Sequence, residues 1–210
     1  MLDGSARKII DPMLDSAGQF LAKRGVSADS VTIASFIVGL ISAIFIVYGY
    51  LISGLALLLL SRVGDGLDGA VARHSQTTDF GGFLDIVLDF AFYGLIPLAF
   101  IIYDPINNAI AGSLLLFSFY ITGSSFLAYS IFAEKWQLKT EVRGQKSIYF
   151  TTGLAEATET FITFALFCIF PDWFSIIAYI FSAICIYTAF SRIMLAKAAF
   201  DASRKEQMPN

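Results

Sequence analysis

The chain has 210 residues, of which 57% are hydrophobic and 15% charged, with a formal net charge of −3 and a mean hydropathy of +0.71. This composition excludes an ordinary soluble domain and leaves room for about six membrane spans of roughly 20 residues each. We therefore predict an all-α integral membrane protein, with six transmembrane helices in one membrane domain and no nucleic-acid partner.

The first predicted element is an amphipathic helix within residues 1–26. Apolar residues between Ile9 and Leu21 recur at spacings of three and four, and most charged residues lie off that stripe. Such a helix lies in the membrane interface or packs on the rest of the protein, and the pattern alone does not separate these two cases. Gly25 ends the segment, and residues 27–30 are typical of a helix N-cap region before an apolar run.

Six apolar runs follow within residues 27–197, and residues 198–210 form a tail. We place the spans at about residues 31–48, from 55 until the charged segment 62–73, and at about 83–102, 109–132, 149–170 and 173–195. Basic residues precede the first span and follow the second, fourth and sixth, whereas the other three connections contain no Lys or Arg. The positive-inside rule then predicts that both termini and the charged segment are cytoplasmic, in a multi-pass protein of the bacterial inner membrane.

Four aspartates lie in and after that charged segment: Asp65, Asp68, Asp85 and Asp89. On helices, the first two and the last two each share a face, and the short connection makes the two helices antiparallel neighbours. Four carboxylates so close together repel one another unless a cation lies among them. Oxygen ligands favour Mg²⁺ or Mn²⁺, so we predict one or two divalent ions, held by Asp65, Asp68 and Asp85.

The same residues carry a family resemblance. The pattern D-x2-D-G-x2-A-R-x7-G-x3-D-x3-D, which ends at Asp89, resembles the signature of the CDP-alcohol phosphotransferases, also called CDP-alcohol phosphatidyltransferases. Every fixed position is present, and the six-span layout is similar too. The resemblance implies an enzyme of phospholipid biosynthesis that transfers the phosphatidyl group of CDP-diacylglycerol to a hydroxyl of an alcohol acceptor and releases CMP.

Roles for single residues follow partly from chemistry and partly from the resemblance. The planar fork of Arg73 suits a diphosphate, and Gly69 lets a nucleotide approach the backbone. The resemblance implies that Asp89 is the general base and leaves open whether it also binds a second ion. It further implies CDP contacts from Gly69, Arg73, Thr78 and the segment Asp29, Ser30, Val31 and Thr32, although a plain helix cap would show the same segment.

Further polar residues point to an acceptor pocket: Arg192, Arg62, Lys146, Glu156 and Glu159. Arg192 resembles an arginine that binds acceptor phosphate in relatives that use inositol phosphate, or it extends to lipid headgroups. Arg62 equally fits a counter-ion for the aspartates. Two glutamates well inside the fifth span need a partner or a cavity. The acceptor stays open among glycerol 3-phosphate, inositol phosphate, serine and phosphatidylglycerol.

Two other functions remain in view. CDP-choline or CDP-ethanolamine could donate to diacylglycerol, or the carboxylates could form the relay of an ion or proton transporter. The spacing of Gly69, Ala72 and Arg73 favours a diphosphate site over a relay. The resemblance also implies a homodimer, and small residues in the fourth span allow close helix approach between two protomers or within one. These residues are Gly112, Ser113, Gly123, Ser124 and Ser125.

Overall fold

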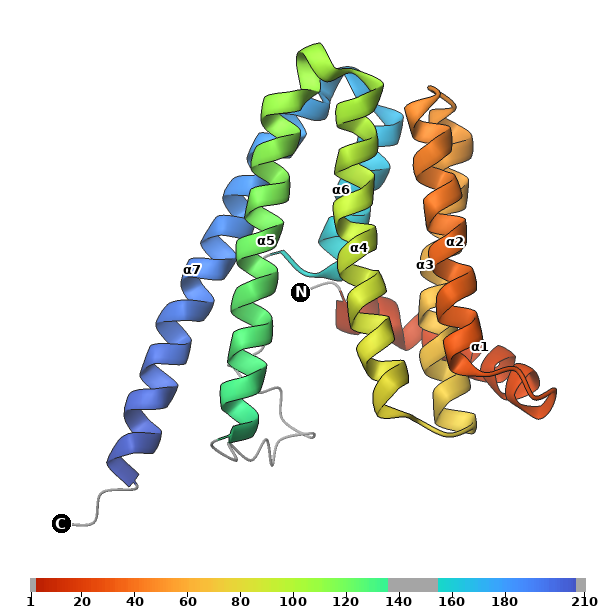
Figure 1. Cartoon of the computed structure of the whole chain (residues 1–210), viewed down its shortest axis with the longest axis vertical. Coiled ribbons are helices and arrows are strands. Elements are labelled where there is room, and N and C mark those ends of the chain that lie inside the picture. Colours follow the sequence, from red (N-terminus) through yellow and green to blue (C-terminus); the bar gives the residue numbers. More distant parts are fainter. Residues whose placement is uncertain (1–2, 136–154, 207–210) are drawn as a thin grey trace.

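The computed structural model of the chain describes residues 3–135 and 155–206, and within these ranges it is all helical, as predicted (Figure 1). The elements are α1 (Asp3–Lys23), α2 (Ala28–Val47), α3 (Leu51–His74), α4 (Asp79–Tyr103), α5 (Pro105–Lys135), α6 (Ala157–Ile169), the 3-10 turn η1 (Pro171–Trp173) and α7 (Phe174–Glu206). Four of the described helices, α2, α4, α5 and α7 with its preceding turn, are long and apolar enough to cross a membrane. The chain is a multi-pass membrane protein.

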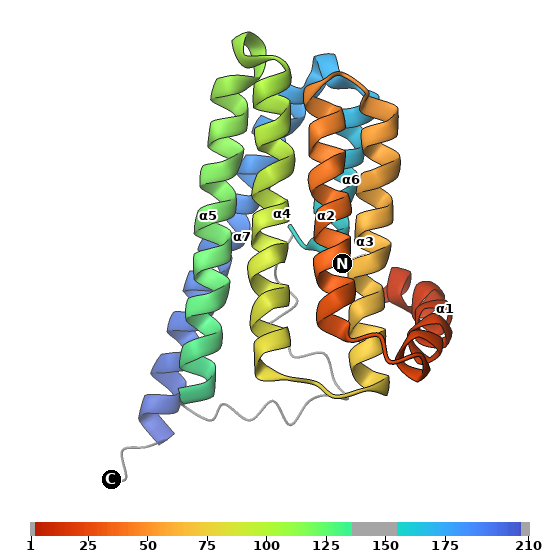
Figure 2. The same cartoon turned by 45° about the vertical axis from the view of Figure 1, so that its right-hand side comes forward.

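The helices α2 to α7 run side by side, and α1 lies across one end of them (Figures 1 and 2). The connection between α3 and α4, residues 75–78, marks what we call the motif end. The connections without Lys or Arg, residues 48–50, Asp104 and 170–173, lie together at the opposite end, which we call the turn end. The chain thus alternates between the two ends as the charge pattern requires.

Two predicted boundaries are wrong. The second span is predicted to end at the charged segment, but its helix, α3, continues unbroken through the aspartates to His74. The fifth span, predicted from about residue 149, has its described helix only from Ala157. Glu156 is therefore the N-cap residue of α6 and Glu159 lies in its first turn, rather than deep inside a span. A helix N-terminus is a favourable place for negative charge, which explains why two carboxylates are tolerated here.

Glycines and serines bring α2, α3 and α4 into close contact. A Cβ atom on Gly39 of α2 would lie 2.8 Å from the Phe92 ring of α4 and 3.0 Å from Ser61 Oγ of α3. Ser61 Oγ also donates a hydrogen bond to the carbonyl oxygen of Ser35 at 2.7 Å, which ties α3 to α2. Small residues allow such approach between membrane helices, and hydrogen bonds across them add to it. The helix α2 therefore packs closely on both α4 and α3, the helix that carries Asp65 and Asp68.

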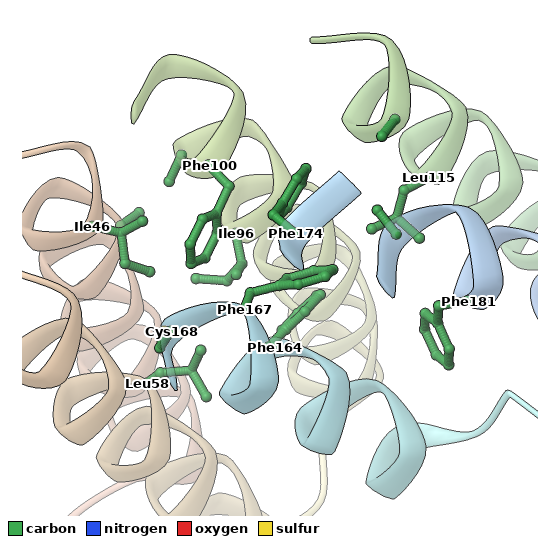
Figure 3. Packing of buried hydrophobic residues seen from close by; sticks show 14 of the residues in the cluster. Ile46, Leu58, Ile96, Phe100, Leu115, Phe164, Phe167, Cys168, Phe174 and Phe181 are labelled. Carbon is green, nitrogen blue, oxygen red and sulfur yellow. The ribbon is translucent and has the colours of Figure 1, made fainter. Parts of the chain in front are cut away.

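Aromatic side chains form the core toward the turn end (Figure 3). The rings of Phe100 and Phe174 stack with centroids 5.2 Å apart, and those of Phe167 and Phe174 are 4.4 Å apart. Because these rings come from α4, α6 and α7, they join α4 to two helices that are distant from it in sequence. They hold the turn-end parts of these helices together.

Three of the five small residues of α5 pack within one protomer. Gly112 faces the Ile101 side chain and Gly123 faces the Phe90 ring, so both glycines serve the contact with α4. Ser125 accepts a hydrogen bond from Arg192 of α7, whereas Ser113 and Ser124 are exposed. The predicted homodimer thus gains no support from the two glycines, and it stays a prediction.

The N-terminal helix α1 packs on α3 with one side. A Cβ atom on Gly18 would lie 2.6 Å from Ala70 Cβ, and one on Gly66 would lie 2.9 Å from Leu14. Other apolar side chains of α1 are open to the surroundings, with Met13 77% and Phe20 53% exposed. The predicted packing on the rest of the protein is therefore confirmed. The exposed apolar side chains suit the membrane interface, and that location stays a prediction.

Candidate active site

The structure brings three aspartates together, two from α3 and one from α4. Carboxylate oxygens of Asp65, Asp68 and Asp85 all lie within 4.8 Å of one another. Asp68 is buried, and the other two are partly buried. Three hard oxygen donors at this separation form a set that can bind a divalent ion such as Mg²⁺ or Mn²⁺. The prediction that the aspartates of the two helices lie close together is therefore confirmed for these three.

The segment before the first span reaches this cluster through one residue. Thr32 Oγ1 of α2 donates a hydrogen bond to Asp68 Oδ2 at 2.6 Å, in a buried position. This bond fixes the orientation of the Asp68 carboxylate. Ser30, by contrast, donates its backbone N–H to Ser27 Oγ at 3.2 Å as part of the helix cap, as the alternative interpretation predicted.

Asp29 and Thr78 lie next to each other at the start of α4. Thr78 is the N-cap of α4, and its Oγ1 accepts a hydrogen bond from the Gly81 N–H at 2.9 Å. A Cβ atom on Gly81 would lie 2.7 Å from Asp29 Oδ1 and 3.0 Å from Thr78 Oγ1. The glycine of the motif is therefore needed so that α2 and the α4 N-terminus can approach. Val31, the remaining residue of the segment, is partly buried in α2.

Asp89 is held by Arg62 instead of joining the cluster of three. Arg62 Nη1 donates to Asp89 Oδ1 at 2.8 Å and lies 3.3 Å from Asp65 Oδ1. The second nitrogen, Nη2, donates to Ser61 Oγ at 3.1 Å. Arg62 thus connects the fourth aspartate of the motif to the first. The counter-ion interpretation of Arg62 matches these contacts.

Arg73 extends from the end of α3 toward α1. Its Nη2 lies 3.5 Å from Asp15 Oδ1, and its side chain is 56% exposed. Among the residues that the structure describes, a Cβ atom on Gly69 would meet only Arg73 Nη1, at 3.8 Å, so the backbone there is open to a ligand. His74 Nε2 lies 3.1 Å from Asp15 Oδ2, and this hydrogen bond, with the charges of His74 and Arg73, lowers the pKa of the Asp15 carboxyl.

A cavity of about 850 Å³ adjoins Asp89 between α4, α5, α6 and α7. Its polar lining includes Asp89, Glu156 and Arg192, and much of the remaining wall is aromatic or aliphatic. Arg192 Nη1 donates to the carbonyl oxygen of Thr122 at 2.9 Å and to Ser125 Oγ at 3.0 Å. These two bonds turn the guanidinium away from a snorkelling position and fix it on the cavity wall.

Not every predicted acceptor residue reaches the cavity. Arg62 and Glu159 are not among the described residues that line it, whereas Asp89, Glu156 and Arg192 are. Lys146 lies outside the described residues. Asp15 is a contact that sequence reasoning missed, because nothing in the pattern of α1 indicated that its polar side faces Arg73 and His74.

Comparison with known proteins decides the family. The family model described as CDP-alcohol phosphatidyltransferase matches residues 25–200. The chain belongs to the CDP-alcohol phosphatidyltransferase family. It is 45% identical over 193 residues to the inner membrane protein YnjF of Escherichia coli, covering 92% of this chain and 94% of that protein. It is also 42% identical over 84 residues to an archaetidylinositol phosphate synthase of Methanothermobacter thermautotrophicus, covering 40% of each chain.

Solved structures confirm the fold of this family member. Phosphatidylinositol phosphate synthase of Mycobacterium tuberculosis with CDP-DAG bound superposes with a TM-score of 0.63, covering 88% of this chain and 94% of that one. A second structure of that enzyme, in complex with manganese and citrate, gives a TM-score of 0.62 and covers 87% and 88%. Sequence identity is 19% in both cases, so the likeness establishes the shared fold.

Proposed function

We propose that this transferase moves the phosphatidyl group of CDP-diacylglycerol to a hydroxyl of an alcohol acceptor and releases CMP. One observation carries the proposal: Asp89 contacts Asp65 of the aspartate cluster through Arg62 and also lines the cavity between α4 and α7. A general base must reach the proton of the attacking hydroxyl while the electrophilic phosphorus lies close by.

The donor site that we propose lies on the open side of α3. The CDP moiety contacts the bare backbone at Gly69, and the exposed guanidinium of Arg73 pairs with the diphosphate. Asp29, Thr32 and Thr78 border this region from α2 and the α4 N-terminus. The CDP-DAG complex of the mycobacterial synthase, which shares the fold, supports this donor.

Asp65, Asp68 and Asp85 would hold Mg²⁺ or Mn²⁺. The cluster of three carboxylates fits such an ion, and the manganese complex of the mycobacterial synthase supports the assignment. When bound, a divalent ion supplies positive charge to the phosphate that is transferred. Thr32 keeps the Asp68 carboxylate in a fixed orientation for this purpose.

In the reaction, Asp89 accepts the proton of the acceptor hydroxyl. The hydroxyl oxygen forms a bond to the phosphorus that carries diacylglycerol, the bond from that phosphorus to the CMP oxygen breaks, and CMP leaves. Arg192 offers a fixed guanidinium for an acceptor phosphate, and Glu156 offers a carboxylate for acceptor hydroxyls. The archaetidylinositol phosphate synthase among the relatives supports a phosphorylated acceptor of the inositol phosphate type.

The test is product analysis with purified full-length protein in lipid nanodiscs. CDP-diacylglycerol and Mg²⁺ are supplied with glycerol 3-phosphate, inositol phosphate, serine or phosphatidylglycerol, and CMP and new lipids are quantified by mass spectrometry. CMP release with one acceptor and its matching lipid is expected. Product only from CDP-choline or CDP-ethanolamine with diacylglycerol would replace this proposal with the reversed substrate pair.

A transporter that uses the carboxylates as a relay is the remaining alternative. The open backbone at Gly69 and the exposed guanidinium of Arg73 argue against it, because a diphosphate site explains both features and a relay explains neither. Reconstituted vesicles that move protons or cations but release no CMP would favour the transporter.

We further propose that the motif end faces the cytoplasm in a bacterial inner membrane and that two protomers form a homodimer. The inner membrane relative and the connections without Lys or Arg at the turn end support the orientation. Cysteine labelling from each side of the membrane tests it at Tyr50 and Gln76. Native mass spectrometry in mild detergent tests the dimer, and a purely monomeric spectrum would contradict it.

A further inference from the structure

Arg62 is a buried cation among the aspartates, and it lies outside the motif that defines the family. Its side chain is only 8% exposed, and its Nη1 faces oxygens of Asp65 and Asp89 at 3.3 and 2.8 Å. Arginine keeps its charge under all ordinary conditions. The positive charge of this group is therefore a permanent part of the site.

The position of the guanidinium is fixed from several directions. Its Cζ lies 3.7 Å from the centroid of the Phe92 ring and 5.7 Å from that of Phe161. Nη2 donates to Ser61 Oγ, and that oxygen in turn donates to the Ser35 carbonyl oxygen. Stacking on an aromatic face and hydrogen bonds together leave the planar group little freedom. Arg62 is thus preorganised, unlike the half-exposed Arg73.

The four aspartates divide into two groups around this cation. Asp65, Asp68 and Asp85 share a region no wider than 4.8 Å, which suits one divalent ion. Asp89 lies outside that group, and its Oδ1 is taken by Arg62, which also contacts Asp65. A second divalent ion between Asp65 and Asp89 would compete with the guanidinium for the same oxygen atoms, and its charge would be repelled by Arg62.

We propose that Arg62 takes the place of a second metal ion in this protein. Each chain then binds one divalent ion, at Asp65, Asp68 and Asp85, and Arg62 neutralises Asp89 and holds it at the cavity as a positioning residue. The inference deepens the proposed function, and it rests on that function only for the role of Asp89. The inference also reduces the predicted number of divalent ions per chain from one or two to one.

Counting bound ions tests this without any turnover. Full-length protein in nanodiscs is stripped with chelator and titrated with Mn²⁺, and free Mn²⁺ is measured by electron paramagnetic resonance. We expect one Mn²⁺ per chain in the wild type. In Arg62→Gln a second, weaker Mn²⁺ should appear, and in the double variant Arg62→Gln/Asp89→Asn it should disappear again, because Asp89 would be its ligand.

Two further variants separate charge from position. Arg62→Lys keeps the charge but loses the planar fork, so it should bind one Mn²⁺ while kcat falls about tenfold or more and KM for CDP-diacylglycerol changes little. Arg24→Gln removes an exposed positive charge directly after α1 and should leave the Mn²⁺ count and kcat unchanged.

Each result supports or overturns the inference. Two Mn²⁺ per wild-type chain overturns it, even if Arg62→Gln fails to fold. One Mn²⁺ of unchanged affinity in a folded Arg62→Gln overturns the role of Arg62 as the second cation. A parallel change of kcat and KM in Arg62→Lys overturns its positioning role. Absence of CMP release with every acceptor would contradict the proposed function instead, and the Mn²⁺ counts would still be readable.

Discussion

The turn end and the motif end are built from the same helices, but different interactions hold them. At the turn end, rings such as Phe100, Phe167 and Phe174 pack face to face or edge to face across three helices. Toward the motif end, Asp68 and Asp89 are bound by one hydroxyl and one guanidinium, and a cavity opens beside them. One end buries apolar rings, and the other buries charge.

The difference shows how a membrane protein can carry several carboxylates without losing its fold. Charges within a membrane are costly unless they are paired or reach water. Here the helices α2, α3 and α4 are joined by close glycine contacts, and α4, α6 and α7 by the aromatic core, so the polar groups need not supply the cohesion. The motif end is then free to leave room for substrates. Substitutions at the two ends should consequently have different effects.

The largest effect is expected at the metal cluster. Asp68→Ala removes the buried carboxylate that Thr32 orients, and metal-dependent CDP binding should be lost altogether, because the cluster loses its one buried and fixed ligand. Isothermal titration with CDP in Mg²⁺ measures this, with Asp172→Ala at the turn end as control. Normal CDP and metal binding by a folded Asp68→Ala would show that the metal assignment is wrong.

The next largest effect is expected on turnover, with substrate binding largely retained. Asp89→Asn keeps the side-chain shape but cannot accept a proton, so CMP release should fall by about 10²–10⁴. CDP-diacylglycerol affinity should change far less, since Arg73 and the cluster of three remain. Both quantities are measured in one preparation, with Asp172→Asn as control. Near-normal turnover would remove Asp89 from catalysis, and equal loss of both would make it a metal ligand first.

At the turn end, the effect should be on stability and not on chemistry. Phe167→Ala removes a ring packed against Phe100 and Phe174, and it should lower the free energy of unfolding by about 3 kcal/mol. This is the low end of the range for soluble cores, because lipid is as apolar as the protein interior. Thermal unfolding in detergent measures it, with the exposed Phe117→Ala as control. Equal destabilisation by both variants would contradict a packed core.

The smallest effect is expected on Mn²⁺ affinity when the hydrogen bond between Thr32 and Asp68 is removed. Thr32→Val retains the shape of the side chain but removes its hydrogen bond to Asp68, so Mn²⁺ affinity should fall about tenfold while stability changes little. Thr163→Val, which removes a partly buried local hydrogen bond in α6, should leave Mn²⁺ affinity unchanged. Unaltered Mn²⁺ binding by Thr32→Val would show that the hydroxyl does not orient the carboxylate.

The sequence predicted those parts of the site that depend on spacing along one helix. Asp65 and Asp68 share a face because they are three residues apart, and the short connection placed Asp85 opposite them. Contacts between distant helices had no such signal. Arg62 was as compatible with an acceptor ligand as with a counter-ion, and only packing against α4 distinguishes the two.

Helix boundaries show the same limit. Hydropathy placed Glu156 inside a span because the residues around it are apolar, whereas the start of α6 is decided by backbone geometry that hydropathy does not record. Hydropathy also ended the second span at the charges, although α3 continues through them. A charged residue lowers the hydropathy of a helix without ending it when its partners lie on the neighbouring helices.

Phe92 belongs to both regions, because its ring receives the Arg62 guanidinium and also contacts Phe164 of the core at 6.3 Å between centroids. The position of this ring therefore affects two interactions at once, the aromatic packing with Phe164 and the placement of the guanidinium that holds Asp89. A substitution of Phe92 should consequently change the stability of the core and the arrangement of charge at the candidate site together.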